Sequence, residues 1–278
     1  MFSDLIYAVI LGIIEGITEW LPISSTAHII IVQNILEAFE IKTSFSEEFM
    51  LMFDVVIQLG AIFAVIIYYY KKLYPFKYND GMYDKKDKIN IWIKVIVACI
   101  PLVLIGFIFD DIVTKFFYNL LTIGITLIFY GLIFIILENY NKNRKYEITD
   151  VKNLNRKKAL AIGFFQSLAI IPGTSRSGIT IISGSLLGCD RKSATEFSFF
   201  LSIPVMIGAS GYKFIKYLLK YTILVNEVII LLIAMLTAMA VSLFVIKKLL
   251  KFVEKYSFKV FGFYRVFLGI IILIMYFL

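Results

Sequence analysis

Two short polar segments interrupt an otherwise apolar chain, and both hold side chains that could do chemistry. The first, GIIEGITEWLPISSTAH at residues 12–28, contains Glu15, Glu19 and His28, and His28 is the only histidine in the chain. Because Glu15 and Glu19 are four residues apart, a helix places both carboxylates on one face, within reach of a shared cation or a substrate group. A pair that faces water at a helix end is the alternative.

Three hydroxyl side chains follow this acidic pair, on Ser24, Ser25 and Thr26. Serine and threonine commonly cap helices, and capping alone is the alternative reading of each one. Taken with the carboxylates before them and His28 after them, however, the set contains a nucleophile, potential bases and a group that titrates near neutral pH. We therefore expect a catalytic cluster in this segment.

The second polar segment, IPGTSRSGIT at residues 171–180, has the chemistry of an anion site. Pro172 ends one half-helix, and Gly173 and Gly178 allow close backbone approach. A half-helix that begins here presents free N–H groups and its positive dipole end, and Arg176 adds a planar fork that fits two phosphate oxygens. The hydroxyl donors around Arg176 are Thr174, Ser175, Ser177 and Thr180. The alternative is an interfacial loop whose arginine reaches water.

Together, the two segments provide the parts of a phosphoryl-transfer site. The second would hold a phosphate, and the acidic pair of the first would hold a divalent cation or activate a nucleophile. A charge near the centre of a bilayer costs at least about 2.5–3.5 kcal/mol, so two carboxylates together need a partner. A substrate phosphate carried on a lipid would explain their position.

The elements that position these residues are membrane helices. Of 278 residues, 60% are hydrophobic and 17% charged, with a mean hydropathy of +0.87. Residues 117–137 and 228–246 carry no charge, and each stretch is long enough to cross a bilayer as a helix. The net charge of +8 does not indicate nucleic-acid binding, because the basic residues lie in short loops between apolar segments.

Six segments are long and apolar enough to span, and two more are broken. The predicted spans are 49–70, 91–109, 117–137, 195–212, 222–246 and 260–278. Residues 1–36 and 159–188 each read as helix, break, helix, which predicts two re-entrant helical hairpins; residues 1–36 could instead span fully. The fold class is thus an all-α integral membrane protein with one membrane domain over residues 1–278.

The two broken regions resemble each other, which predicts an internal repeat. Gly12 and Glu15 precede Pro22, and 150 or 151 positions later Gly163 and Gln166 precede Pro172. The repeat divides the chain into residues 1–150 and 151–278, each with one hairpin and three spans. Chance similarity between apolar helices is the alternative.

Topology follows from the basic residues. The loops at 71–90, 138–158, 189–194 and 247–259 hold 20 Lys and Arg, whereas 1–4, 37–48, 110–116 and 213–221 hold 5. The first group is therefore expected in the cytoplasm. Three spans in each half invert the second half relative to the first, so the hairpins enter from opposite sides and their tips can meet near the midplane.

These segments resemble the two signature motifs of the undecaprenyl-diphosphate phosphatases, also called bacitracin-resistance proteins. FDVVIQLGAI at 53–62 and EFSFFLSIP at 196–204 are similar to further blocks of the family. The resemblance implies a bacterial plasma-membrane enzyme that removes the terminal phosphate of undecaprenyl diphosphate. It also implies dependence on a divalent cation, magnesium or calcium, an active site that faces the outer side, and bacitracin resistance.

Carried over by motif position, the resemblance implies roles for single residues. The catalytic set is Glu15, Glu19, Ser25 and His28, with Glu15 and Glu19 also holding the metal. The phosphate binders that it implies are Ser175, Arg176 and Thr180. Our reading of the two breaks adds Thr26, Gly173, Thr174 and Ser177 to the predicted substrate-binding set. Ala27 and Trp20 depart from the glycine and phenylalanine frequent in the family, and neither change removes a reactive group.

Three questions stay open at this point: the catalytic mechanism, the function and the oligomeric state. Glu19 could deprotonate Ser25 for attack on phosphorus, or a metal-bound water could attack while Ser25 positions it. A secondary transporter or lipid-phosphate flippase of the same architecture is the alternative function, because broken helices that meet at the midplane are also typical of transporters. The partners expected are the polyprenyl diphosphate and the bilayer, with no nucleic acid, and a homodimer is possible.

Overall fold

The computed structural model describes residues 2–41, 43–76 and 83–277. Over these residues the chain is helical, and the β-type pairing recorded is an isolated bridge between Ile148 and Cys189. The α-helices are α1 (Phe2–Thr18), α2 (Ser25–Ala38), α3 (Glu47–Val56), α4 (Gln58–Tyr68), α5 (Tyr70–Leu73), α6 (Lys85–Phe117), α7 (Leu120–Tyr140), α8 (Arg156–Gln166), α9 (Arg176–Leu186), α10 (Arg191–Leu218), α11 (Val225–Lys255) and α12 (Lys259–Phe277). Three short 3₁₀ helices are η1 (Asn141–Asn143), η2 (Val151–Asn153) and η3 (Ser167–Ile170).

Six helical segments of the described chain are long and apolar enough to cross a membrane, as the sequence predicts. They are Glu47–Tyr68, which joins α3 and α4, Lys85–Gly106 within α6, and the helices α7, α10, α11 and α12. Their mean hydropathies lie between 1.3 and 2.9. The all-α membrane fold class is therefore confirmed.

The boundary between the second and third spans differs from the prediction. Residues 110–116, expected to form a loop, continue α6 to Phe117, and the third span begins at Leu120 rather than at residue 117. The physical reason is Asn119, whose side chain accepts a hydrogen bond from the backbone N–H of Thr122 and so caps α7. The apolar run therefore contains a helix end that hydropathy alone does not reveal.

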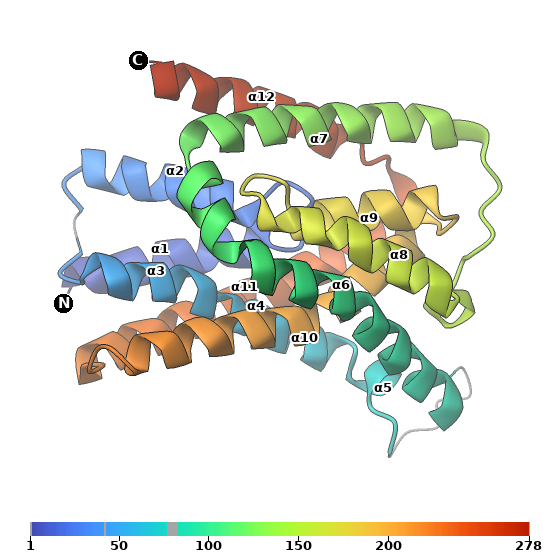
Figure 1. The fold of residues 1–278 in the computed structure, drawn as a ribbon, viewed down its shortest axis with the longest axis horizontal. Helices are drawn as coiled ribbons and strands as arrows, with labels where there is room; N and C mark the ends of the chain where they lie inside the picture. The colour runs from blue at the N-terminus through green and yellow to red at the C-terminus, as the bar shows by residue number, and fades with distance from the viewer. Residues whose placement is uncertain (1, 42, 77–82, 278) are drawn as a thin grey trace.

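Both broken regions form a pair of helices joined by a turn. The first pair is α1 and α2, and the second is α8, extended by η3, and α9. In Figure 1 the turn of the first pair (blue) and the turn of the second (yellow) meet near the centre of the molecule, while the pairs open toward opposite ends. Their re-entrant position in a bilayer and the inverted repeat stay predictions.

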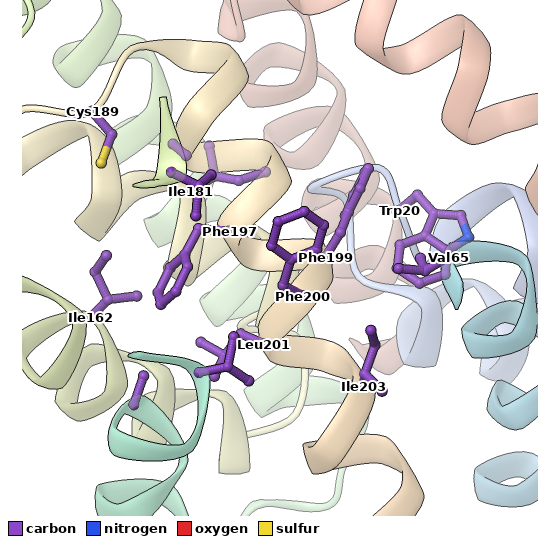
Figure 2. Packing of buried hydrophobic residues seen from close by; sticks show 14 of the residues in the cluster. Trp20, Val65, Ile162, Ile181, Cys189, Phe197, Phe199, Phe200, Leu201 and Ile203 are labelled. Carbon is purple, nitrogen blue, oxygen red and sulfur yellow. The ribbon is translucent and has the colours of Figure 1, made fainter. Parts of the chain in front are cut away.

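A continuous core of buried aliphatic and aromatic side chains surrounds these turns. Trp20, in the first turn, lies edge-on to Phe199 of α10, with ring centroids 4.9 Å apart. Figure 2 shows Phe197, Phe199 and Phe200 of α10 projecting among the side chains of neighbouring helices, and Trp20 belongs to the same buried cluster as Val65 of α4. The turns are therefore held by packing against the predicted spans.

Candidate active site

Glu19 joins the two turns. It follows the last residue of α1, and its N–H still donates to the carbonyl of Glu15 at 3.0 Å, which continues the helical register. One carboxylate oxygen, Oε2, accepts a hydrogen bond from Oγ of Ser25 at 2.6 Å, and the other, Oε1, accepts one from Nη2 of Arg176 at 2.9 Å. Glu19 is 6% exposed, so this acid, hydroxyl and guanidinium form a largely buried unit.

Arg176 is the first residue of α9 and is held from α10 as well. Its Nη1 donates to the carbonyl of Ser198 at 3.0 Å. The Ser198 hydroxyl lies 2.7 Å from that of Thr180, which also contacts the carbonyls of Arg176 and Ser177. Thr180 therefore lies behind Arg176 and supports it. The role of Ser198 was not predicted, although it lies in the EFSFFLSIP block that the resemblance identified.

Hydrogen bonds between backbone and side chain tie the two turns to each other. Ser177 Oγ donates to the carbonyls of Glu19 and Leu21, at 3.1 and 3.3 Å. Ser175 Oγ caps α9 by accepting from the N–H of Gly178 at 3.1 Å. The prediction that an acidic segment and an arginine segment meet is confirmed by these contacts and by the pairing of Glu19 with Arg176.

Both returning helices start from a serine in the left-handed backbone region. The φ angle is 73° at Ser24, just before α2, and 69° at Ser175, just before α9. Gly173 is also left-handed, with φ 84°, and a Cβ there would stand 2.1 Å from Oγ1 of Thr126. Left-handed serines each cost roughly 1–3 kcal/mol, and such strain concentrates at functional sites.

A cavity of about 170 Å³ opens beside the two turns. The predicted site residues that line it are Glu19, Ser25, Thr26, Gly173, Ser175, Arg176 and Ser177. Gln58, at the start of α4, and Val205, Met206 and Ala209 of α10 also line it and were not predicted. Gln58 lies in the FDVVIQLGAI block that the resemblance identified, whereas Val205, Met206 and Ala209 lie in a segment that reads as an ordinary span.

Glu15 lies next to this unit but does not line the cavity. Its side chain is 0% exposed, and neither carboxylate oxygen has a hydrogen-bond partner among the described residues. It is within electrostatic range of Glu19, Asp54 and Arg176. A buried carboxylate without partners is costly, so Glu15 is suited to hold a proton or a cation.

His28 faces away from the cavity. Its Nδ1 lies 2.7 Å from the carbonyl of Ser24, and its Nε2 lies 2.7 Å from the hydroxyl of Tyr264 on α12. The two rings are stacked, with centroids 5.6 Å apart. Thr174 is buried and also does not line the cavity. The structure thus brings together most of the predicted site but leaves His28, Glu15, Thr174 and Thr180 outside the cavity wall.

A second, larger cavity of about 510 Å³ lies between α1, α2 and α3. Asp54 lines it, and its two carboxylate oxygens accept hydrogen bonds from Nε2 of Gln33, both at 3.0 Å. None of the predicted site residues lines this second cavity. The chemistry of the two motifs therefore belongs to the smaller cavity.

Comparison with known proteins agrees with this geometry. The sequence profile of the family described as "Bacitracin resistance protein BacA" matches residues 8–271. The chain belongs to the BacA family. An "Undecaprenyl-diphosphatase" of Acetivibrio thermocellus is 51% identical over 99% of this chain and 98% of its own length. Proteins of the same name from Enterococcus faecalis and Desulfitobacterium hafniense are 53% and 48% identical, over 98% of this chain and 98% and 95% of their own lengths.

The match to this family covers both motifs, all six candidate spans up to residue 271 and every residue that lines the smaller cavity. The resemblance based on the four sequence blocks is therefore confirmed. The comparisons give no support to a transporter or flippase, because the BacA relatives named above are called diphosphatases.

Proposed function

We propose that this chain hydrolyses the terminal phosphate of undecaprenyl diphosphate, giving the monophosphate carrier and inorganic phosphate. Relatives that match nearly the full chain at 48–53% identity are named for this activity. The structural observation that carries the proposal is the position of Glu19, which contacts both a nucleophilic hydroxyl and a phosphate-binding guanidinium. These are the groups that phosphoryl transfer requires.

The terminal phosphate binds at the start of α9. Ser175, Arg176 and Ser177, at the start of α9, line the cavity and would offer an anion a guanidinium, two hydroxyls and the positive end of the helix dipole. Charge builds up on the equatorial oxygens of the transferring group, so donors that are fixed before the reaction lower its barrier. The incoming phosphate competes with Glu19 for Arg176, which frees the Glu19 carboxylate to act as a base.

Ser25 is the nucleophile that the contacts favour. Its hydroxyl already donates to Glu19 at 2.6 Å, the geometry of a nucleophile and its base. Oγ of Ser25 attacks the terminal phosphorus while its proton passes to Glu19. The bond between that phosphorus and the bridging oxygen breaks, and undecaprenyl monophosphate leaves. Water then attacks the phosphoserine, which releases phosphate and regenerates the hydroxyl.

The residues present fit a divalent cation such as magnesium or calcium. Glu15 offers two buried carboxylate oxygens that have no hydrogen-bond partner in the described part of the chain, and Glu19 lies within electrostatic range. No group of three His, Cys, Asp or Glu side chains in the described part of the chain could hold a metal alone. Magnesium is commonly bound by one or two carboxylates plus substrate phosphates, so Glu15 and Glu19 would hold it with the diphosphate. When bound, the cation would neutralise phosphate charge.

In the cell, this activity returns the lipid carrier to cell-wall synthesis. The six apolar helices make the chain a multi-pass membrane protein, and the plasma membrane of a bacterium is where the substrate is used. We place the cavity toward the outer side and the base-rich loops in the cytoplasm. Bacitracin binds the diphosphate, so an enzyme that consumes the diphosphate confers resistance.

The test is phosphate release by detergent-purified protein given undecaprenyl diphosphate and magnesium or calcium. The wild-type chain should release phosphate with steady turnover, and Glu19→Gln should lose at least about 10²-fold in kcat, because it lacks both the base and the ion pair. Glu254→Gln is the control, since it removes an exposed carboxylate whose partner is Lys192, far from the cavity. An inactive wild-type protein, or full turnover by Glu19→Gln, would disprove the proposal.

A further inference from the structure

Arg265 is a buried arginine that contacts both turns of the site from outside the two motifs. It lies on α12 and is 0% exposed. Its Nη1 donates to the carbonyl of Pro22 at 3.1 Å, and its Nη2 donates to the carbonyls of Gly173 and Thr174, at 2.8 and 3.0 Å. One side chain, remote in sequence from both motifs, therefore joins the first turn to the second.

The charge of Arg265 has no carboxylate partner within the described ranges. Besides the three carbonyls, its guanidinium lies 5.8 Å from the ring centroid of Tyr130, which gives a cation–π contact. Burying a charge costs free energy. A well-packed apolar side chain in the same place usually leaves the fold at least as stable. Among the described residues, the hydrogen bonds of this buried cation go to three carbonyls, so its position is better explained by what it does to those carbonyls than by stability.

The carbonyl of Thr174 sets the direction of the next amide. In a trans peptide the C=O and the following N–H point in opposite directions. Because the Thr174 carbonyl faces Arg265, the N–H of Ser175 faces away from it. Gly173, Ser175, Arg176 and Ser177 line the cavity, whereas Thr174 and Arg265 do not. Because Ser175 itself lines the cavity, an N–H of Ser175 that points away from Arg265 is available to a phosphate that we place there.

We propose that Arg265 is a positioning residue for the phosphate site. It holds the first and second turns at a fixed separation, and it fixes the 174–175 peptide so that the Ser175 N–H donates to the substrate phosphate. It acts through the backbone and does not touch the substrate. This inference rests on the proposed diphosphatase function, which it extends by one residue that neither motif contains.

The experiment compares Arg265→Met, which keeps the length without the charge, and Arg265→Lys, which keeps the charge without the fork. Arg144→Met is the matched control. Nη1 and Nη2 of Arg144 also donate to carbonyls of α9, those of Ser185 and Leu186, but at the opposite end of the helix. For each purified protein we would measure kcat, KM, thermal stability in detergent, and the inhibition constant of inorganic phosphate.

We expect folded Arg265→Met to lose about 10²-fold in kcat, since a misplaced catalytic group typically has that effect. Its inhibition constant for phosphate should rise about tenfold or more, while KM, to which the polyprenyl tail contributes, changes less. Arg265→Lys should fall between Arg265→Met and wild type, and Arg144→Met should match wild type in both quantities. A change in phosphate affinity at constant fold is something a merely structural arginine would not produce.

Wild-type kcat and phosphate inhibition in folded Arg265→Met would overturn the proposal. If Arg265→Met does not fold, Arg265→Lys decides: an increased inhibition constant supports the positioning role, and wild-type values reject it. Loss of folded protein in both variants would make Arg265 a structural residue and would also reject it. These outcomes are distinct from failure of the proposed function, in which the wild-type protein itself releases no phosphate.

Discussion

The carboxylate of Glu19 has two partners of opposite character, a hydroxyl that could give up a proton and a guanidinium that stabilises the charged acid. In the mechanism that we propose, this ion pair with Arg176 restrains Glu19 from acting as a base. A substrate phosphate, which carries more charge than a carboxylate, should draw Arg176 away. The base would then become active only when the substrate is bound, which protects Ser25 from unproductive reaction.

The hydrogen bond from Ser25 to Glu19 predicts a covalent intermediate. With undecaprenyl diphosphate that is radiolabelled in its terminal phosphate, acid quenching during turnover should trap label on Ser25. Ser25→Ala should trap none and lose about 10²-fold or more in kcat. Ser257→Ala is the control, because Ser257 donates to Glu138 among the base-rich loops and does not line the cavity. It should trap label as the wild type does. Steady turnover by Ser25→Ala would instead favour direct attack by water.

The contacts of His28 predict that its substitution lowers kcat less than the substitution of a catalytic base would. His28 bonds the Ser24 carbonyl and the Tyr264 hydroxyl, so it supports the turn that carries Ser25. We expect His28→Gln and Tyr264→Phe each to lower kcat less than about tenfold and to leave the shape of the pH–rate profile unchanged. A general acid or base would contribute about 10²–10⁴-fold and would shift one limb of that profile. A loss of that size in His28→Gln alone would restore the catalytic role.

At the residue scale, the sequence predicted which side chains lie together better than where each one points. Glu19, Ser25 and Arg176 meet because two breaks with polar residues must bury those residues against each other. Nothing in the sequence indicates that Ser24 and Ser175 are left-handed, because serine has no intrinsic preference for that region. Arg265 was missed for a related reason: it lies in an apolar segment that reads as an ordinary span.

At the scale of elements, several observations support the proposed repeat. The left-handed serines, Ser24 and Ser175, are 151 positions apart, the spacing that also separates Gly12 from Gly163. A Cβ on Gly12 would lie 2.6 Å from a carbonyl of α11, and a Cβ on Gly163 would lie 2.2 Å from a carbonyl of α6. The first hairpin therefore packs closely on α11 of the second half, and the second hairpin packs closely on α6 of the first half. Two inverted copies would show this reciprocal packing.

The two halves differ at Gly60 and Gly208, which hold corresponding positions in the sequence repeat. A Cβ on Gly60 of α4 would stand 2.1 Å from the carbonyl oxygen of Met235, whereas a Cβ on Gly208 would meet nothing within 4 Å. Gly60→Ala should therefore separate α4 from α11 and cost about 1–3 kcal/mol or more. Gly208→Ala, the matched control, should leave thermal stability in detergent unchanged or slightly higher, because alanine favours helix. Equal melting temperatures for the two variants would contradict the close approach of α4 and α11.

At the scale of the whole molecule, the base-rich loops gather at one end. Tyr83 bonds Asp150, Lys192 pairs with Glu254, and Arg191 pairs with Glu138. These contacts join loops that the sequence assigned to one side from their basic residues. The connections at 39–41, 43–46, 118–119 and 219–224 lie at the other end, the end toward which α1 and α2 open (Figure 1). Charge pattern thus predicted which loops lie together, although not which contacts join them.

Labelling of single cysteines can decide which end faces the cytoplasm. Lys145 is exposed at the base-rich end, and Lys220 is exposed at the other. We expect a membrane-impermeant maleimide to label Lys220→Cys in intact cells and to label Lys145→Cys only after permeabilisation. The native thiols should stay silent, because Cys99 and Cys189 are buried and burial raises the pKa of Cys189 to about 12, so that little thiolate forms. Labelling of Lys145→Cys in intact cells would invert the topology and would place the α1–α2 opening on the cytoplasmic side, which would contradict the outward-facing cavity that we propose.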